Sequence, residues 1–211
     1  MILYANGDSH TYGFSVNPGS PNFVNILAKQ INYKEVNHAT PGASNDKILR
    51  TTLDWLKNNT PDFVVIGWAT WEREEWSIDN KYYQVSASGT NTVPDEYKQK
   101  YKEWVLKQDS DMCDIKSRAV HEKIYQLHQD LSVKKIPHLF FNAFENFIGI
   151  RELVKDWNNC FIEPYTLKFS YYHYLKNNGF KTVGNNYHYG DDGHRAWADF
   201  LIVYIKENKL L

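Results

Sequence analysis

The stretch ILYANGDS, residues 2–9, decides the expected fold because it joins a buried strand to a tight polar loop. Its apolar and aromatic side chains follow one another without polar alternation, which is typical of a short strand buried on both faces. Asn6 and Gly7 then favour a sharp turn. The stretch therefore predicts a core strand with Ser9 at the mouth of the sheet.

Similar apolar runs predict further strands over residues 34–39, 62–67 and 137–143, and a weaker one over 160–162. Apolar side chains at helical spacing predict helices that contain residues 23–31, 48–56, 120–131, 169–175 and 196–205. Ser44 and Ser117 precede two of these helices and are the expected caps. This alternation predicts the α/β class, with a mainly parallel sheet of about five strands and helices on both faces.

The composition excludes several classes of protein. A chain of 211 residues without repeats or linkers predicts one domain, residues 1–211, with an aromatic-rich insertion over about 72–116. A net charge of −1 argues against nucleic acid or an anionic membrane as a partner. No apolar run reaches the roughly 18 residues of a membrane span. Two cysteines without CxxC spacing and no signal peptide predict a cytoplasmic protein. The oligomeric state is not indicated.

Three loops carry residues suited to catalysis, and in α/β sheets ligands bind where the strands end. Residues 6–13 contain Ser9, residues 40–45 contain Gly42, and residues 188–194 end in the pair Asp191 and His194. A serine hydroxyl is a poor nucleophile that needs a base, and the base needs an acid to orient it. Each loop taken alone is also explained as a turn or a helix cap.

In this order the loops resemble the blocks of the SGNH, or GDSL-type, hydrolase family. Gly7-Asp8-Ser9 matches the nucleophile block, although His10 replaces the usual Leu. Gly42 matches the second block, and residues 191–194, Asp-Asp-Gly-His, match the Asp-x-x-His block. The resemblance covers the whole chain, but its motifs are short.

The resemblance implies a flavodoxin-like, three-layer α/β/α fold and a catalytic triad that needs no cofactor. Ser9 would be the nucleophile, His194 the general base and Asp191 the group that orients it. The backbone N–H of Gly42 would help to form the oxyanion hole.

One block departs from the family pattern of Gly-x-Asn-Asp. The strand over 62–67 is followed by Trp68 and Ala69, so that Ala69 stands where the family has the Asn that donates to the oxyanion. Losing one such donor costs about 10²–10³ in rate. We hypothesise that Asn45 or Thr70 supplies the missing hydrogen bond, and the guanidinium of Arg73 is a third candidate.

The expected function is that of a serine esterase that acts through an acyl-enzyme on a small-molecule or carbohydrate ester, such as an O-acetyl sugar. The alternative is a catalytically impaired relative that binds glycans or proteins through the aromatic side chains of the insertion. A metal site is a further alternative, because the loops contain side chains that commonly bind metals: Asp8, His10, His188, Asp191, Asp192 and His194. The sequence blocks of metal-dependent phosphoesterases are absent, however. We therefore expect no catalytic metal.

Two further expectations concern residues away from these loops. His121 and His128 are predicted on a solvated helix face, because charged residues surround them in sequence. Cys160 lies in an apolar run and is expected to serve packing.

Overall fold

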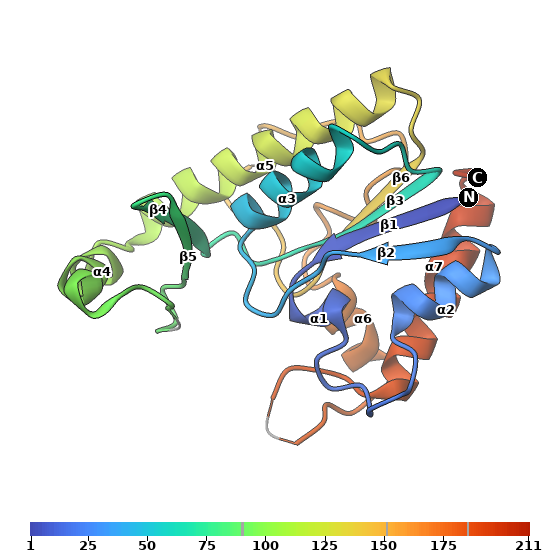
Figure 1. Ribbon diagram of the computed structural model, residues 1–211, viewed down its shortest axis with the longest axis horizontal. Helices are drawn as coiled ribbons and strands as arrows, with labels where there is room; N and C mark the ends of the chain where they lie inside the picture. Colours follow the sequence, from blue (N-terminus) through green and yellow to red (C-terminus); the bar gives the residue numbers. More distant parts are fainter. Residues whose placement is uncertain (90, 151, 185) are drawn as a thin grey trace.

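A computed structural model describes residues 1–89, 91–150, 152–184 and 186–211. Its main sheet is parallel, has the order β2-β1-β3-β6, and consists of β1 (Ile2–Gly7), β2 (Lys34–Asn37), β3 (Phe63–Trp68) and β6 (His138–Asn142) (Figure 1). The predicted strand over 160–162 is reduced to a parallel bridge between Phe140 and Phe161. The predicted mainly parallel sheet is confirmed, with four full strands.

Helices cover both faces of the sheet (Figure 1). One face packs against α2 (Phe23–Gln30), α6 (Tyr171–Asn177) and α7 (Asp191–Glu207). The other packs against α3 (Asn45–Leu56) and α5 (Ser110–Val133). Side chains of β1 alternate between the two cores, since Leu3 belongs to the first and Tyr4 to the second. The predicted α/β/α layering is confirmed.

The long helix α5 begins earlier than the sequence predicts. Asp109 caps it, accepting from the N–H of Met112 at 2.9 Å, whereas Ser117 lies two turns inside the helix. The first buried residue of α5 is Ser117, so its first turns make no core contact and carry no apolar stripe for a sequence pattern to detect.

His121 and His128 correct a second expectation. Both are buried, at 0% and 3% exposure, on the stripe of α5 that also holds Val120 and Ile124. The prediction of a solvated face was wrong because spacing along the helix, more than charged sequence neighbours, decides which residues face the core.

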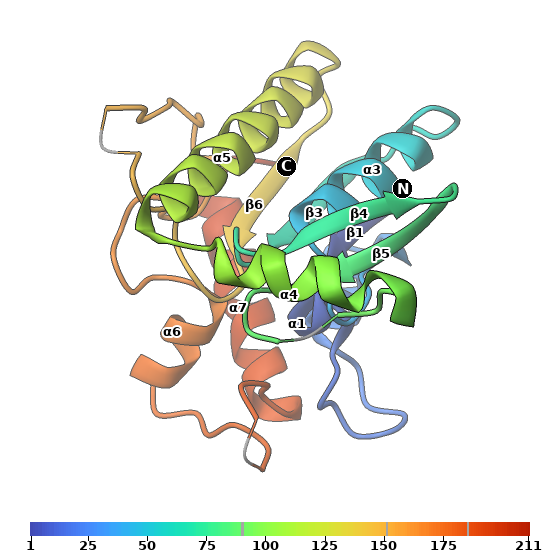
Figure 2. The ribbon, with the colours of Figure 1, turned by 90° about the vertical axis from the view of Figure 1, so that its left-hand side faces the viewer.

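The segment over 72–116 forms the antiparallel hairpin of β4 (Glu74–Ile78) and β5 (Lys81–Val85), followed by η1 (Asp95–Tyr97) and α4 (Lys98–Leu106). Figure 2 shows this hairpin and α4 in front of the sheet, beyond the carboxyl ends of its strands. Arg50 of α3 holds the hairpin with two hydrogen bonds to Glu75, at 2.7 and 2.8 Å. These hydrogen bonds join the hairpin to α3 beside the carboxyl ends of the strands.

Among the described residues, none of the helices combines the length and the apolar character that a membrane span needs.

Candidate active site

Ser9 is placed by a very close approach between β1 and β3. A Cβ atom on Gly7 would meet the carbonyl oxygen of Gly67 at 2.8 Å and would collide with Thr11. Glycine at this position therefore allows the chain to turn directly from β1 into the short helix α1 (Ser9–Tyr12). Asp8 caps α1 by accepting from the N–H of His10 at 2.9 Å. Ser9 is the first residue of α1 and stands at the carboxyl end of β1.

The hydrogen-bond partner of Ser9 is His188. Ser9 Oγ lies 2.7 Å from His188 Nε2, although 179 residues separate the two in sequence. Burial, and then the neighbouring His10, lower the pKa of His188 to about 4. The imidazole is therefore neutral at neutral pH, and its Nε2 is able to accept the serine proton.

The structure does not bring Ser9 to His194, which corrects the predicted pairing. His194 Nδ1 accepts from the N–H of Phe23 at 3.2 Å, and Nε2 lies 3.4 Å from Tyr171 Oη. The side chain is 1% exposed and its ring is stacked on Phe23. Burial, and then His10, lower the pKa of His194 to about 3. Its position is that of a core histidine.

Asp191 does not orient a histidine either. Its carboxylate accepts from the backbone N–H and the side-chain amide of Asn17, at 2.9 and 3.1 Å. These hydrogen bonds lower the pKa of Asp191. Because α7 starts at Asp191, one helical turn separates it from His194, and the two side chains bind different parts of the chain.

His188, which the sequence prediction did not choose as the base, has one ring nitrogen without a partner within the described ranges. Its Nδ1 is buried and has no hydrogen-bond partner among the residues that the structure describes. In sequence, Asn185 stands three residues before His188, and Asn185 lies outside the described residues. The Asn-x-x-His spacing is the one sequence signal that could have pointed to His188, whereas the prediction chose Asp191 and His194 because they match the Asp-x-x-His block.

A hydrogen-bonded network of Asp8, His10 and Arg73 adjoins the Ser9–His188 pair. Asp8 is 1% exposed; its carboxylate lies 3.1 Å from His10 Nδ1 and accepts from Arg73 Nη1 at 3.2 Å. Burial alone would raise the pKa of Asp8, but His10 and Arg73 outweigh it and hold the pKa well below its usual range. The His10 ring stacks on that of His188, with the ring centres 4.8 Å apart. The network therefore supports His188 from one side.

The three predicted replacements for the missing oxyanion donor lie in different surroundings. The amide of Asn45 donates to the carbonyl of Ala69 and accepts from its N–H, both at 2.9 Å, so it is fully used in holding that loop. Arg73 is engaged by Asp8. Thr70 is 6% exposed, and its Oγ1 has no partner within the described part of the chain. Thr70 is therefore the replacement with a free hydroxyl.

A cavity of about 360 Å³ opens over Ser9 and His188. Its other lining residues are His10, Thr70, Glu72, Arg73, Ser88, Phe144, Glu145 and Tyr187. Burial, followed by the negative charge of Glu72, raises the pKa of Glu145. The rings of Phe144 and Tyr187 meet edge to face, with their centres 5.3 Å apart. The cavity lining therefore contains both acidic and aromatic side chains.

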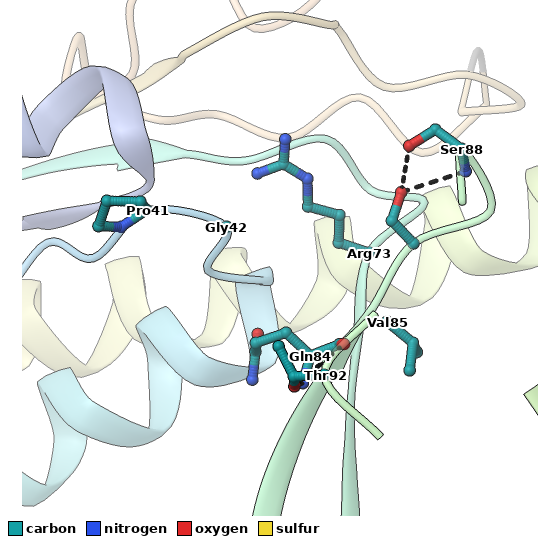
Figure 3. Close-up of a pocket in the computed structure, with 8 residues that line it drawn as sticks. Pro41, Gly42, Arg73, Gln84, Val85, Ser88 and Thr92 are labelled. Carbon is teal, nitrogen blue, oxygen red and sulfur yellow. Dashed lines mark hydrogen bonds between the residues drawn. The ribbon is translucent and has the colours of Figure 1, made fainter. Parts of the chain in front are cut away.

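A second, smaller cavity adjoins the first and shares Arg73 and Ser88 with it. Figure 3 shows Arg73 between the loop of Pro41 and Gly42 on one side and Ser88 on the other. Gly42 has a φ of 74°, a left-handed conformation that favours glycine. Gly42 lines the second cavity, whereas the described lining of the cavity over Ser9 and His188 does not include it.

Three solved structures, among them two esterases, share the fold of this chain. The psychrotrophic esterase EstA from Pseudoalteromonas sp., solved with monoethylphosphonate as inhibitor, is 10% identical with a TM-score of 0.59, over 98% of this chain and 97% of that one. TesA is 12% identical with a TM-score of 0.56, over 100% of both chains. The acetyl xylan esterase AlAXEase is 17% identical with a TM-score of 0.52, over 97% of this chain and 100% of that one.

No family model matches the sequence, and no curated protein matches it. The chain has the fold of solved esterases such as EstA and AlAXEase. The resemblance predicted from three short blocks is thus confirmed at the level of the fold.

Proposed function

We propose that the chain is a serine esterase in which Ser9 is the nucleophile and His188 the general base. The observation that carries this proposal is the 2.7 Å contact between Ser9 Oγ and His188 Nε2 at the floor of a cavity. The fold shared with EstA and TesA supports the same chemistry. His188 takes the place that the sequence assigned to His194.

The reaction follows from these positions. His188 Nε2 takes the proton of Ser9 as Oγ attacks the ester carbonyl, and the backbone N–H groups of Ser9 and Gly42 with the Thr70 hydroxyl stabilise the oxyanion. The alcohol leaves with the proton from His188. Water then attacks the acyl-enzyme by the same route, which releases the acid and restores Ser9.

The substrate we propose is a short acyl ester of a carbohydrate, such as an O-acetyl sugar. Aromatic rings at the cavity wall, Phe144 and Tyr187, offer flat apolar surfaces for a sugar ring. Glu72 and Glu145 in the same wall disfavour an anionic substrate. The likeness to the acetyl xylan esterase AlAXEase supports the acetyl group.

A second candidate function is non-catalytic glycan binding. Two observations favour it: Ala69 replaces the amide donor of the family pattern, and His188 Nδ1 lacks a carboxylate partner within the described residues. One structural neighbour is a carbohydrate esterase whose active site "displays divergent catalytic and non-catalytic binding functions". This chain spans 64% of that protein, with a TM-score of 0.51.

Labelling with a fluorophosphonate probe distinguishes the two functions. We expect wild type to be labelled and to hydrolyse an acetyl ester, Ser9→Ala to lose both properties, and Ser88→Ala, in the wall of the same cavity, to keep both. An unlabelled wild type that binds acetylated oligosaccharides and turns none over would support the binding function and contradict the esterase.

A further inference from the structure

Two histidines and a cysteine meet near the opposite ends of the strands from Ser9. His128 comes from α5, His138 is the first residue of β6, and Cys160 directly precedes the bridge that joins Phe161 to β6. One nitrogen of each ring and the Cys160 sulfur all lie within 4.8 Å of one another. Since β6 runs from His138 toward the active-site edge, the cluster is separate from the esterase site.

The hydrogen bonds of the two rings fix which ring nitrogens carry protons, and the proton that lies between the two rings is the one that a metal would displace. His138 Nδ1 lies 2.9 Å from the carbonyl oxygen of Ile136 and must carry the proton, because a carbonyl only accepts. His138 Nε2 is then unprotonated, and His128 Nδ1 lies 2.8 Å from it. A backbone carbonyl that fixes the tautomer of an imidazole in this way is typical of metal-binding histidines.

Burial favours the uncharged form of all three groups. His128 and His138 are 3% and 2% exposed, and burial lowers the pKa of both, that of His138 to about 4, so both are neutral at neutral pH. Cys160 is partly exposed, and burial raises the pKa of its thiol to about 11. The thiol is therefore unreactive unless a cation stabilises its thiolate.

We propose that His128, His138 and Cys160 bind one divalent transition-metal ion of the zinc class, with water as the fourth ligand. Imidazole and thiolate donors suit Zn²⁺ in tetrahedral geometry. On binding, the Cys160 S–H bond breaks and its proton goes to water as the metal–sulfur bond forms. The proton between the two rings moves to the other nitrogen of His128, which frees Nδ1, and no group is oxidised or reduced.

Such an ion would tie three separate elements together at this end of the sheet. It would join the C-terminal part of α5 to the start of β6 and to the segment that replaces the fifth strand. The bound ion with one thiolate has a net charge of +1, and the negative charge of Asp156 acts on His128 from nearby. The role is structural, and the ester chemistry at Ser9 does not depend on it.

Titration with Co²⁺ as the probe tests the site in the full chain. We expect one equivalent to bind and to give a thiolate-to-cobalt charge-transfer band that Zn²⁺ abolishes by displacement. Cys160→Ser should lose the band and bind at least tenfold more weakly, while Cys113→Ser, the matched control at the other cysteine, should behave as wild type. His138→Gln should also bind weakly, with His173→Gln as its control.

Three results would overturn the proposal: no cobalt–thiolate band in wild type, a band that survives in Cys160→Ser, or equal weakening in Cys113→Ser. If His138→Gln does not fold, the cysteine pair still decides, since serine is close in size to the partly exposed Cys160. A band lost with Cys113 would place the metal elsewhere in the chain.

Discussion

Two neighbouring regions near the C-terminus place their histidines in opposite environments, one beside a cavity and one in the core. In the loop before α7, His188 is half-buried at the floor of a cavity and one ring nitrogen contacts Ser9. In the first turn of α7, His194 is 1% exposed and hydrogen-bonded to the N–H of Phe23. Both have a strongly lowered pKa, so a perturbed pKa alone does not identify the catalytic base. The contact with Ser9 is what distinguishes His188 as the base in the proposed mechanism.

The largest expected effect is the difference in kcat between variants of these two histidines. His188→Gln should lower kcat for an acetyl ester by roughly 10²–10⁴, because Ser9 loses the acceptor for its proton. His194→Gln, the matched control, should keep kcat within about threefold in the folded protein, because it contacts no reacting atom. Steady-state kinetics on both variants checks this prediction. An equal loss of kcat in both variants would contradict the different roles assigned to the two histidines.

The second largest expected change in kcat concerns the proposed oxyanion hole. Thr70→Val should lower kcat by about 10²-fold with little change in KM, because the hydroxyl acts on charge that develops only in the transition state. Ser88→Ala, in the same wall, is the control and should leave kcat nearly unchanged. A normal kcat in Thr70→Val would show that the hydroxyl does not help and would return the question to the backbone donors.

The dependence of activity on pH sharpens the comparison further. A base works when deprotonated, so kcat/KM should stay level from neutral pH to about pH 5 and fall about tenfold per unit below the His188 pKa of about 4. Circular dichroism at each pH confirms that the enzyme is folded. A midpoint near 6.5, the ordinary histidine value, would contradict the buried environment assigned to His188.

Replacing His194 should have the smallest effect on rate and should instead lower the stability of the fold. His194→Ala should lower the free energy of unfolding by about 1–3 kcal/mol, because the Phe23 N–H loses its acceptor. The folded pKa of His194 is about 3, below the unfolded value near 6.5, so its contribution is complete above pH 6.5 and is lost as the pH falls toward 3. Urea melts at pH 7 and pH 4 should therefore show a smaller difference between wild type and variant at pH 4.

The sequence predicts the sheet correctly because its strands depend on local signals, and a local signal also places Ser9 directly after the first strand. The apolar runs of β1, β3 and β6 are buried on both faces, and the turn of Gly7 directly precedes Ser9. The histidine could not be chosen in the same way. Both His188 and His194 follow polar loop residues, and only the start of α7 at Asp191 decides which ring turns into the core.

Two other differences have the same physical origin. Asn45 looked free to donate, but its amide pairs with the backbone of Ala69, a contact between distant parts of the chain that no sequence pattern encodes. His128 and Cys160 looked unrelated, 32 residues apart by number, until the fold placed them around His138. Long-range contacts of buried polar groups are set by tertiary packing.

Phosphonylation of Ser9 tests the central claim most directly, because it reports the reactivity of the nucleophile without needing the natural substrate. The rate should be measured by intact mass for wild type, His188→Gln and His194→Gln, with peptide mapping to place the adduct. We predict an adduct on Ser9 that forms at least about 10²-fold more slowly in His188→Gln and at nearly the wild-type rate in His194→Gln. Rapid labelling of His188→Gln with slow labelling of His194→Gln would contradict the account.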